Sequence, residues 1–177
     1  MNTSLGLDLS TSATGIVLLG ETGGNGPPLL LYEEEFKPKP HGLTGKREIA
    51  VKVMTTIRDK KPTIIVLEGY GLNLKNASSI VPLIELGGIV RLMLHLDGLA
   101  WYAPTPGECK KFSTGKGNSP KDIVMMHVYK RWQYEAKTNN LADAYVCAAM
   151  GLARLNAANA VTKDMQNVVS GMELFTN

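Results

Sequence analysis

Apolar positions in the first fifth of the chain follow the short runs and two-residue alternation that are typical of β-strands. Residues 4–9 and 13–20 read as two strands, and the polar turn at 10–12 between them predicts a hairpin. The stretch 21–28 contains three glycines and two prolines and is expected to be a loop. A third strand follows at 29–36, and its glutamates favour the edge of a sheet. These patterns predict an antiparallel meander of three strands.

A helical period begins after the meander. Ile49, Val53 and Ile57 recur every four residues, which predicts a helix that Pro62 terminates. The β-branched run at 63–68 then suits a strand that is buried on both faces. Because this strand follows a helix rather than a tight turn, it implies a crossover and a parallel neighbour.

A long helix is expected at residues 76–98, with two glycines near its middle. Gly87 and Gly88 each cost about 1 kcal/mol relative to alanine in a helix interior. A close helix contact would offset this cost, either in the core or at a dimer interface.

The rest of the chain predicts one more strand and two more helices. The strand lies at 100–104, and the helix at 119–132 is expected to begin with Ser119 as its N-cap. The last strong helix covers 140–155, and the tail at 157–177 has room for one short helix.

This order of elements is that of the ribonuclease H-like α/β fold. We expect a mixed five-stranded sheet, with three antiparallel strands followed by two parallel ones, and helices on both faces. Residues 1–156 are expected to form this domain and residues 157–177 a C-terminal tail.

Composition and charge limit the class of protein. The chain has 177 residues, of which 44% are hydrophobic and 20% charged, with a net charge of +3, as in a globular domain. No apolar run reaches the roughly 18 residues that span a bilayer, and the N-terminus does not resemble a signal peptide. We therefore expect a cytoplasmic protein without a membrane partner, whose cysteines Cys109 and Cys147 are reduced.

Three acids occupy positions where an unpaired carboxylate is costly. Asp8 lies among leucines in the first strand, Glu68 ends the fourth, and Asp143 lies in the first turn of an alanine-rich helix. No lysine or arginine is their neighbour in sequence, so a divalent cation such as Mg²⁺ is the simplest partner. Asn140 is three residues before Asp143, and its amide oxygen is expected to face the same cation.

Four segments, taken in order, resemble the RuvC family of Holliday junction resolvases, especially its phage-type members. They are LGLDLSTSATGIVLL (5–19), IIVLEGYGLNLKNASS (64–79), CKKFSTGKGNSPKDIV (109–124) and NNLADAYVCAAM (139–150). The resemblance implies a homodimeric endonuclease that depends on Mg²⁺, with Mn²⁺ as a substitute, and cuts four-way DNA junctions in recombination and repair. If a phage encodes the chain, the host cytoplasm is the expected location.

The resemblance places the catalytic and metal-binding acids of the family on Asp8, Glu68 and Asp143. The remaining metal-site position falls on Asn140, where the family commonly has aspartate and sometimes histidine. Asparagine cannot supply a fourth negative charge to two dications. Either the second metal binds more weakly, or the substitution inactivates the chain.

Basic residues are expected to contact DNA. Lys110 and Lys121 take the positions of the catalytic lysines that the family places near the scissile phosphate, and Lys116 lies between two glycines that allow a phosphate to approach. Lys75 and Lys111 are further candidates for DNA contact. The alternative for the lysine-rich stretch is a solvated surface loop.

The loop that follows the fourth strand contains Tyr70 and Leu72. In the resembling family this loop probes the centre of the junction, where an apolar wedge can unstack bases. Packing of Tyr70 on the edge of the sheet is an equally good interpretation.

Two other functions remain open. The segment at 6–19 is also similar to the first phosphate loop of actin-like kinases and ATPases, but those proteins need two domains and a Gly-rich adenosine motif. A junction-binding protein without cleavage activity is favoured only by Asn140.

Overall fold

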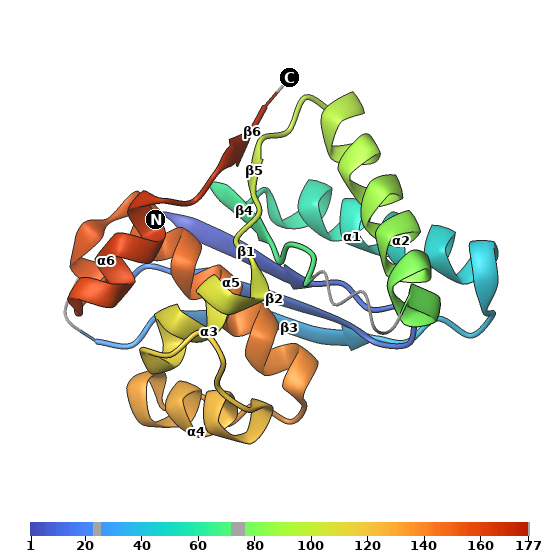
Figure 1. Cartoon of the computed structure of the whole chain (residues 1–177). Helices are drawn as coiled ribbons and strands as arrows, with labels where there is room; N and C mark the ends of the chain where they lie inside the picture. Colours follow the sequence, from blue (N-terminus) through green and yellow to red (C-terminus); the bar gives the residue numbers. More distant parts are fainter. Residues whose placement is uncertain (23–25, 72–76, 177) are drawn as a thin grey trace.

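The computed structural model contains one mixed sheet. It describes residues 1–22, 26–71 and 77–176, with only the backbone for 77–79. The strands are β1 (Thr3–Asp8), β2 (Thr14–Gly20), β3 (Leu29–Phe36), β4 (Ile64–Leu67), β5 (Trp101–Tyr102) and β6 (Leu174–Phe175). They are arranged in the order β3-β2-β1-β4-β5-β6 (Figure 1). The predicted meander and the placement of β3 at an edge are confirmed.

Pairing within the sheet follows the predicted directions. The pairs β1–β2 and β2–β3 are antiparallel, whereas β1–β4 and β4–β5 are parallel. The sheet has six strands rather than five, because β6 pairs antiparallel with β5. A strand of two residues is too short to leave a periodic pattern in the sequence, so β6 was not predicted.

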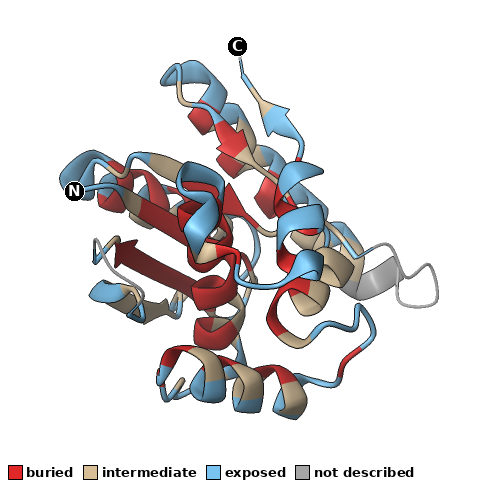
Figure 2. Ribbon diagram, turned by 90° about the vertical axis from the view of Figure 1, so that its left-hand side faces the viewer, coloured by how far each residue is buried: buried red, intermediate tan, exposed pale blue. Residues whose placement is uncertain are grey.

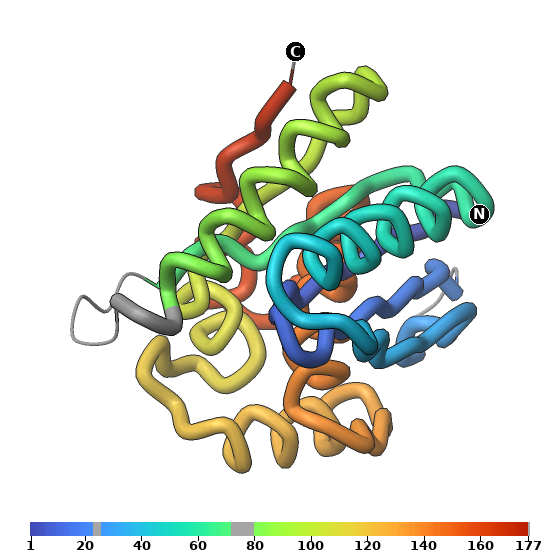
Figure 3. The backbone as a smooth tube through the Cα atoms, turned by 90° about the vertical axis from the view of Figure 1, so that its right-hand side faces the viewer, coloured from blue at the N-terminus to red at the C-terminus, as the bar shows by residue number. Residues whose placement is uncertain are grey.

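Helices cover both faces of the sheet, as predicted. They are α1 (Gly42–Lys60), α2 (Ala77–Leu96), α3 (Pro106–Thr114), α4 (Lys121–Trp132), α5 (Asn139–Leu155) and α6 (Lys163–Ser170), with a short 3-10 helix at Ala157–Asn159. Buried residues are concentrated in the central strands and in the helix faces turned toward them (Figure 2). Helices α1 and α2 lie next to each other on one face (Figure 3), and α5 crosses the other face with α3, α4 and α6 packed around it.

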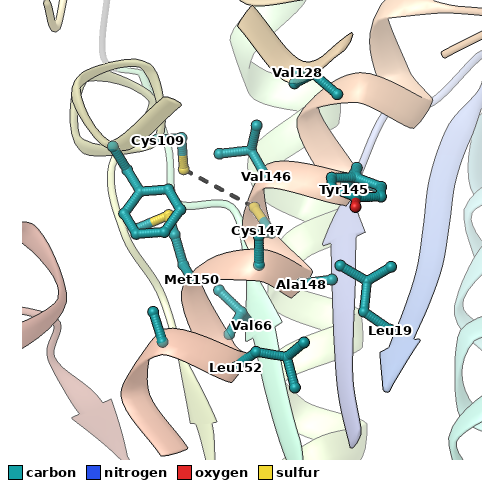
Figure 4. Packing of buried hydrophobic residues seen from close by; sticks show 14 of the residues in the cluster. Leu19, Val66, Cys109, Val128, Tyr145, Val146, Cys147, Ala148, Met150 and Leu152 are labelled. Atoms are coloured by element: carbon teal, nitrogen blue, oxygen red, sulfur yellow. Dashed lines mark hydrogen bonds between the residues drawn. The ribbon is translucent and has the colours of Figure 1, made fainter. Parts of the chain in front are cut away.

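The alternation of side chains along β2 separates two buried clusters. Ile16 and Leu18 pack with α1 and α2, whereas Val17 and Leu19 pack with α5 on the opposite face. In the second cluster, Tyr145 and its neighbours from α5 lie over the sheet (Figure 4). Both clusters are apolar throughout, so burial of this surface is the main source of stability.

Small residues bring α5 very close to the sheet. A Cβ atom at Gly6 would lie 2.0 Å from the carbonyl oxygen of Ala144, and one at Gly15 would lie 2.2 Å from that of Asn140. Only glycine fits at these two strand positions without displacing the helix backbone. The first turn of α5 is therefore fixed against the ends of β1 and β2.

Helix α3 was not predicted, although a local signal for it exists. Thr105 and Glu108 form a reciprocal capping box, and Pro106 occupies the first helical turn. The predicted cap of α4 is wrong, because the N-cap residue is Pro120. The hydroxyl of Ser119 instead lies 2.7 Å from that of Thr114 and donates a hydrogen bond to the carbonyl oxygen of Lys116.

Residues 157–177 contribute α6 and β6. Helix α6 is the short helix that was expected in this segment. Met165, Val168 and Val169 of α6 belong to the same buried cluster as α5. The boundary at residue 156 stays a prediction.

The two cysteines are free thiols. The Sγ atoms of Cys109 on α3 and Cys147 on α5 lie 3.9 Å apart in the core (Figure 4). Among the described residues, no helix combines the length and the apolar character that crossing a membrane requires.

Candidate functional site

Asp8 and Glu68 lie next to each other at the carboxyl ends of two parallel strands. Leu7 pairs with Leu67 across β1 and β4, and the amide of Glu68 donates a 2.9 Å hydrogen bond to the carbonyl oxygen of Leu7. Leu7 packs toward α1 and α2, so Asp8, the next residue, faces α5 on the other side of the sheet. The strand register thus brings together two acids that are 60 positions apart.

Helix α5 brings the third acid to this edge. Thr138 caps the helix by accepting a 3.3 Å hydrogen bond from the amide of Leu141, which fixes where the first turn begins. The close approach at Gly6 and Gly15 places that turn over the end of β1. Asp143 is consequently close enough to Asp8 and Glu68 to raise the pKa values of both carboxyl groups.

The three carboxyl groups are held in an environment that opposes their ionisation. Asp8 is only 9% exposed, and burial, followed by repulsion from Glu68 and Asp143, raises its pKa well above the ordinary value. Burial and repulsion from Asp143 raise the pKa of Glu68 to about 7. Burial also raises the pKa of Asp143. A set of hard oxygen donors that repel one another fits a divalent cation.

These residues suit a divalent cation because they offer carboxylate oxygens, although they do not form a complete coordination site. Among the described residues, no three His, Cys, Asp or Glu side chains already have the geometry of a metal cluster.

Two of the predicted lysines flank the acids. Lys110 on α3 and Lys121 at the start of α4 both lower the pKa values of Glu68 and Asp143 through their positive charges. Neither lysine forms an ion pair with a described carboxylate. The compensation is therefore partial and leaves both ammonium groups available to an anion.

The other lysines of this stretch lie apart from the acids. Lys111 pairs with Asp164 of α6 at 3.5 Å, because adjacent helix residues point in different directions. Lys116 is exposed in the turn between α3 and α4. Leu72 and Lys75 lie outside the described residues, so nothing here tests their predicted roles.

Asn140 has a partner that the sequence did not indicate. Its Nδ2 atom donates a 3.1 Å hydrogen bond to Oε1 of Glu35 on β3, and Glu35 is also paired with Lys37 at 2.8 Å. Glu35 pairs with Gly15, which in turn pairs with Asp8. Asp8 and Glu35 therefore lie in one row across β1, β2 and β3, and Asn140 lies above this row.

Tyr70 is packed against α2. Its hydroxyl donates a 3.2 Å hydrogen bond to the carbonyl oxygen of Ile84 and accepts one of 2.6 Å from Nη1 of Arg91. A Cβ atom at Gly87 would lie 2.2 Å from this hydroxyl, whereas one at Gly88 would meet nothing within 4 Å. The close contact of Gly87 is therefore made within the chain, which is the first of the two explanations expected for these glycines. The wedge role of Tyr70 stays a prediction.

Comparison with known proteins identifies relatives, although no family model matches the chain. Over 106 residues the chain is 28% identical to "Crossover junction endodeoxyribonuclease RuvC" of Chlamydia muridarum. The chain is therefore similar in sequence to a RuvC protein. The matched part covers 58% of this chain and 62% of the relative, which is less than two thirds of the relative's length.

Solved structures show the same fold. Thermus thermophilus RuvC superposes with a TM-score of 0.69 at 17% identity, over 98% of this chain and 99% of that chain. T. thermophilus RuvC in complex with a Holliday junction substrate gives 0.68 at 20% identity, over 88% and 96%. The fowlpox virus resolvase in complex with Holliday junction DNA gives 0.54 at 12%, over 91% and 99%. The predicted ribonuclease H-like fold and the resemblance to RuvC are confirmed.

Proposed function

We propose that this chain is a metal-dependent endonuclease that cuts four-way DNA junctions. The observation that carries the proposal is the meeting of Asp8, Glu68 and Asp143 from three separate elements at one sheet edge. Lys110 and Lys121 flank them on the side of α3 and α4. Homology to a crossover junction endodeoxyribonuclease supports the reaction and the substrate.

Asp8, Glu68 and Asp143, with the amide oxygen of Asn140, would hold Mg²⁺ or Mn²⁺. When bound, such cations supply an activated water and stabilise the charge of the leaving oxygen. Asp8, whose pKa is raised by both Glu68 and Asp143, would be one of the ligands of these cations. Glu68 would bind one cation or orient the attacking water, because its carboxyl group already has a pKa of about 7.

The flanking lysines would hold the DNA rather than the metal. Lys110 and Lys121 carry positive charge toward the acids, so they would neutralise the scissile phosphate as it approaches three carboxylates. Lys116 is exposed and free to reach a neighbouring phosphate. Lys111 forms only an exposed pair with Asp164, which DNA could displace at little cost.

A nicking assay tests the proposal. Four-way junctions and linear duplexes with the same arm sequences are incubated with Mg²⁺ and, separately, with Mn²⁺. We expect paired nicks in junction arms, little cleavage of the duplex, and no cleavage by the Asp143→Asn variant. Equal cleavage of junction and duplex would contradict the branch specificity, and cleavage by Asp143→Asn would place the active site elsewhere.

Asn140 supports one alternative, which is a protein that binds junctions without cutting them. A neutral amide in place of a carboxylate leaves three negative charges for two dications. Tight junction binding by the parent chain, combined with no nicking in either metal, would favour this alternative.

We also propose that the chain is a homodimer that pairs through α2. Val81, Ile84, Leu92 and Leu96 are exposed on this helix, the last two to 58% and 72%, and their spacing places them along one side. Gly88 lies in the same row with open space above it. A stripe of this kind around a small residue suits a helix crossing, and a two-fold axis would supply two active sites for two strands.

A further inference from the structure

Arg91 lines a small cavity together with two acids of the candidate active site, Asp8 and Glu68. The cavity has a volume of about 90 Å³ and lies between the ends of β1 and β4 and helix α2. Its lining includes Asp8 and Glu68 at the strand ends, Tyr70 after β4, and Leu83 and Arg91 on α2. A cation on α2 and the presumed metal ligands thus share one space.

Arg91 is partly buried and has no acidic partner among the described residues. Every described ion pair involves other cations; Arg58, for example, pairs with Asp97 at 2.8 Å. The undescribed residues 23–25, 72–76 and 177 contain no aspartate or glutamate side chain. Burial lowers the pKa of Arg91, as expected for a cation that lacks a compensating anion.

Tyr70 holds the guanidinium group in a defined orientation. The group lies 4.4 Å from the centroid of the Tyr70 ring, and Nη1 donates its 2.6 Å hydrogen bond to the Tyr70 hydroxyl. Among the described residues, this hydrogen bond uses one of the five N–H donors of Arg91. The remaining donors form a planar fork of the kind that binds phosphate oxygens.

We propose that Arg91 binds a phosphate of the DNA strand that occupies the carboxylate cluster. The inference rests on the proposed nuclease function and adds a residue from the opposite side of the site. The charges of Lys110 and Lys121 act on the acids from α3 and α4, whereas Arg91 lines the cavity from α2, and these helices lie on different sides of the strand ends (Figure 3). The strand would thus be held from both sides while the acids bind the cations.

An alternative role for Arg91 is to hold Tyr70 in place without contacting DNA. The experiment must distinguish this role from phosphate binding. The variants Arg91→Gln and Arg91→Lys remove the charge and the fork respectively. Tyr70→Phe removes the hydrogen bond but leaves the charge and the ring. Arg58→Gln is the matched control, because Arg58 is exposed at the end of α1 and paired with Asp97.

The experiment is junction binding by fluorescence anisotropy in EDTA, measured over a range of salt concentrations. We expect Arg91→Gln to weaken binding about tenfold and to reduce the slope of log K against log[salt] by about 1. Arg91→Lys should keep the slope of the parent and bind more weakly, whereas Tyr70→Phe and Arg58→Gln should keep the slope. Thermal unfolding of each variant checks that the fold is intact.

Three results would overturn the inference. One is an unchanged slope for Arg91→Gln, and another is an equal loss of slope in Tyr70→Phe, which would make Arg91 a positioning residue for Tyr70. The third result applies if Arg91→Gln does not fold. In that case, an Arg91→Lys variant that binds junctions with the affinity of the parent would overturn the inference. Failure of the proposed function is separate, because it would appear as a parent chain that does not cut junctions at all.

Discussion

Asn140 on α5 and Glu35 on the edge strand β3 are joined by a hydrogen bond of 3.1 Å from Nδ2 to Oε1. An ionised carboxylate only accepts hydrogen bonds, so the amide nitrogen has to face Glu35 and the amide oxygen is turned away from it. Asn140 therefore differs from aspartate in its partner as well as in its charge. Glu35 keeps its own negative charge, because hydrogen bonds with Lys37 and with Asn140 lower its pKa.

The exchange Asn140→Asp should destabilise the metal-free protein. It replaces a donor by a second carboxylate facing Glu35, which should cost about 1–3 kcal/mol. The measurement is thermal unfolding in EDTA, with the double variant Asn140→Asp/Glu35→Gln as the control that restores a donor. An unchanged melting temperature for the single variant would show that the contact contributes nothing.

The same exchange should strengthen metal binding. A fourth negative charge for two dications should raise cleavage at limiting Mg²⁺, and Mn²⁺ should partly rescue the parent chain. A metal titration of junction cleavage compares the parent with Asn140→Asp. If the parent is fully active and the variant needs as much Mg²⁺ or more, asparagine is the adapted residue here.

The metal-free protein should lose stability as the pH rises from about 4.5 to about 7. The folded state raises the pKa of Glu68 to about 7, so it binds more protons than the unfolded state in this range, and ionisation at higher pH opposes folding. Glu68→Gln should remove a penalty on the order of 3 kcal/mol at pH 8. Urea unfolding in EDTA at pH 5 and pH 8 measures the difference.

The carboxylates of β3 do not contribute to the difference in stability between pH 5 and pH 8. Hydrogen bonds and ion pairs lower the pKa values of Glu33, Glu34 and Glu35, so their contribution is lost only at a pH below this range. Parent stability that is equal at pH 5 and pH 8, or a Glu68→Gln variant that is no more stable at pH 8, would contradict the prediction. Added Mg²⁺ should stabilise the parent more than the variant.

Lys110→Ala and Lys121→Ala should each weaken junction binding without unfolding the protein. Loss of one phosphate contact should reduce the slope of log K against log[salt] by about 1. Lys130→Ala is the matched control, because Lys130 is exposed in the last turn of the same helix as Lys121. Slopes identical to the parent for both variants would place these lysines away from DNA.

Gly6→Ala should disturb both the fold and the site. Its Cβ atom would lie 2.0 Å from the backbone oxygen of Ala144, and such overpacking costs about 1–3 kcal/mol. The displaced α5 would move Asp143 away from Asp8. Gly107→Ala is the control, since its Cβ atom would approach no atom closer than 3.8 Å, and urea denaturation should show no loss for it.

Leu92→Glu should convert the proposed dimer into monomers. Leu92 is 58% exposed in the stripe on α2, and a carboxylate there would be desolvated in a paired interface. Multi-angle light scattering at micromolar concentration measures the mass. Val161→Glu, at a residue that is 70% exposed away from α2, should remain dimeric. A parent chain that is monomeric with and without DNA would refute the interface.

Patterns that are local in sequence were enough to predict most of the fold. The four-residue period of Ile49, Val53 and Ile57 identifies α1, because burial on one face imposes a period that can be read without knowing the partner. The glutamates at 33–35 favoured an edge position for β3. The acids were found in a similar way. A carboxylate among leucines, such as Asp8, is costly whatever lies opposite it.

Contacts between distant residues were decided only by the tertiary structure. Glu35 and Asn140 are 105 positions apart, and their contact depends on strand register and on how closely α5 approaches Gly15. The same holds for Gly87 and Gly88, which are identical in sequence terms but face Tyr70 and open space. It also holds for Arg91, whose position beside the acids follows from the packing of α2. Side-chain direction at one helix position is set by the surface against which the helix packs, and no local period encodes that surface.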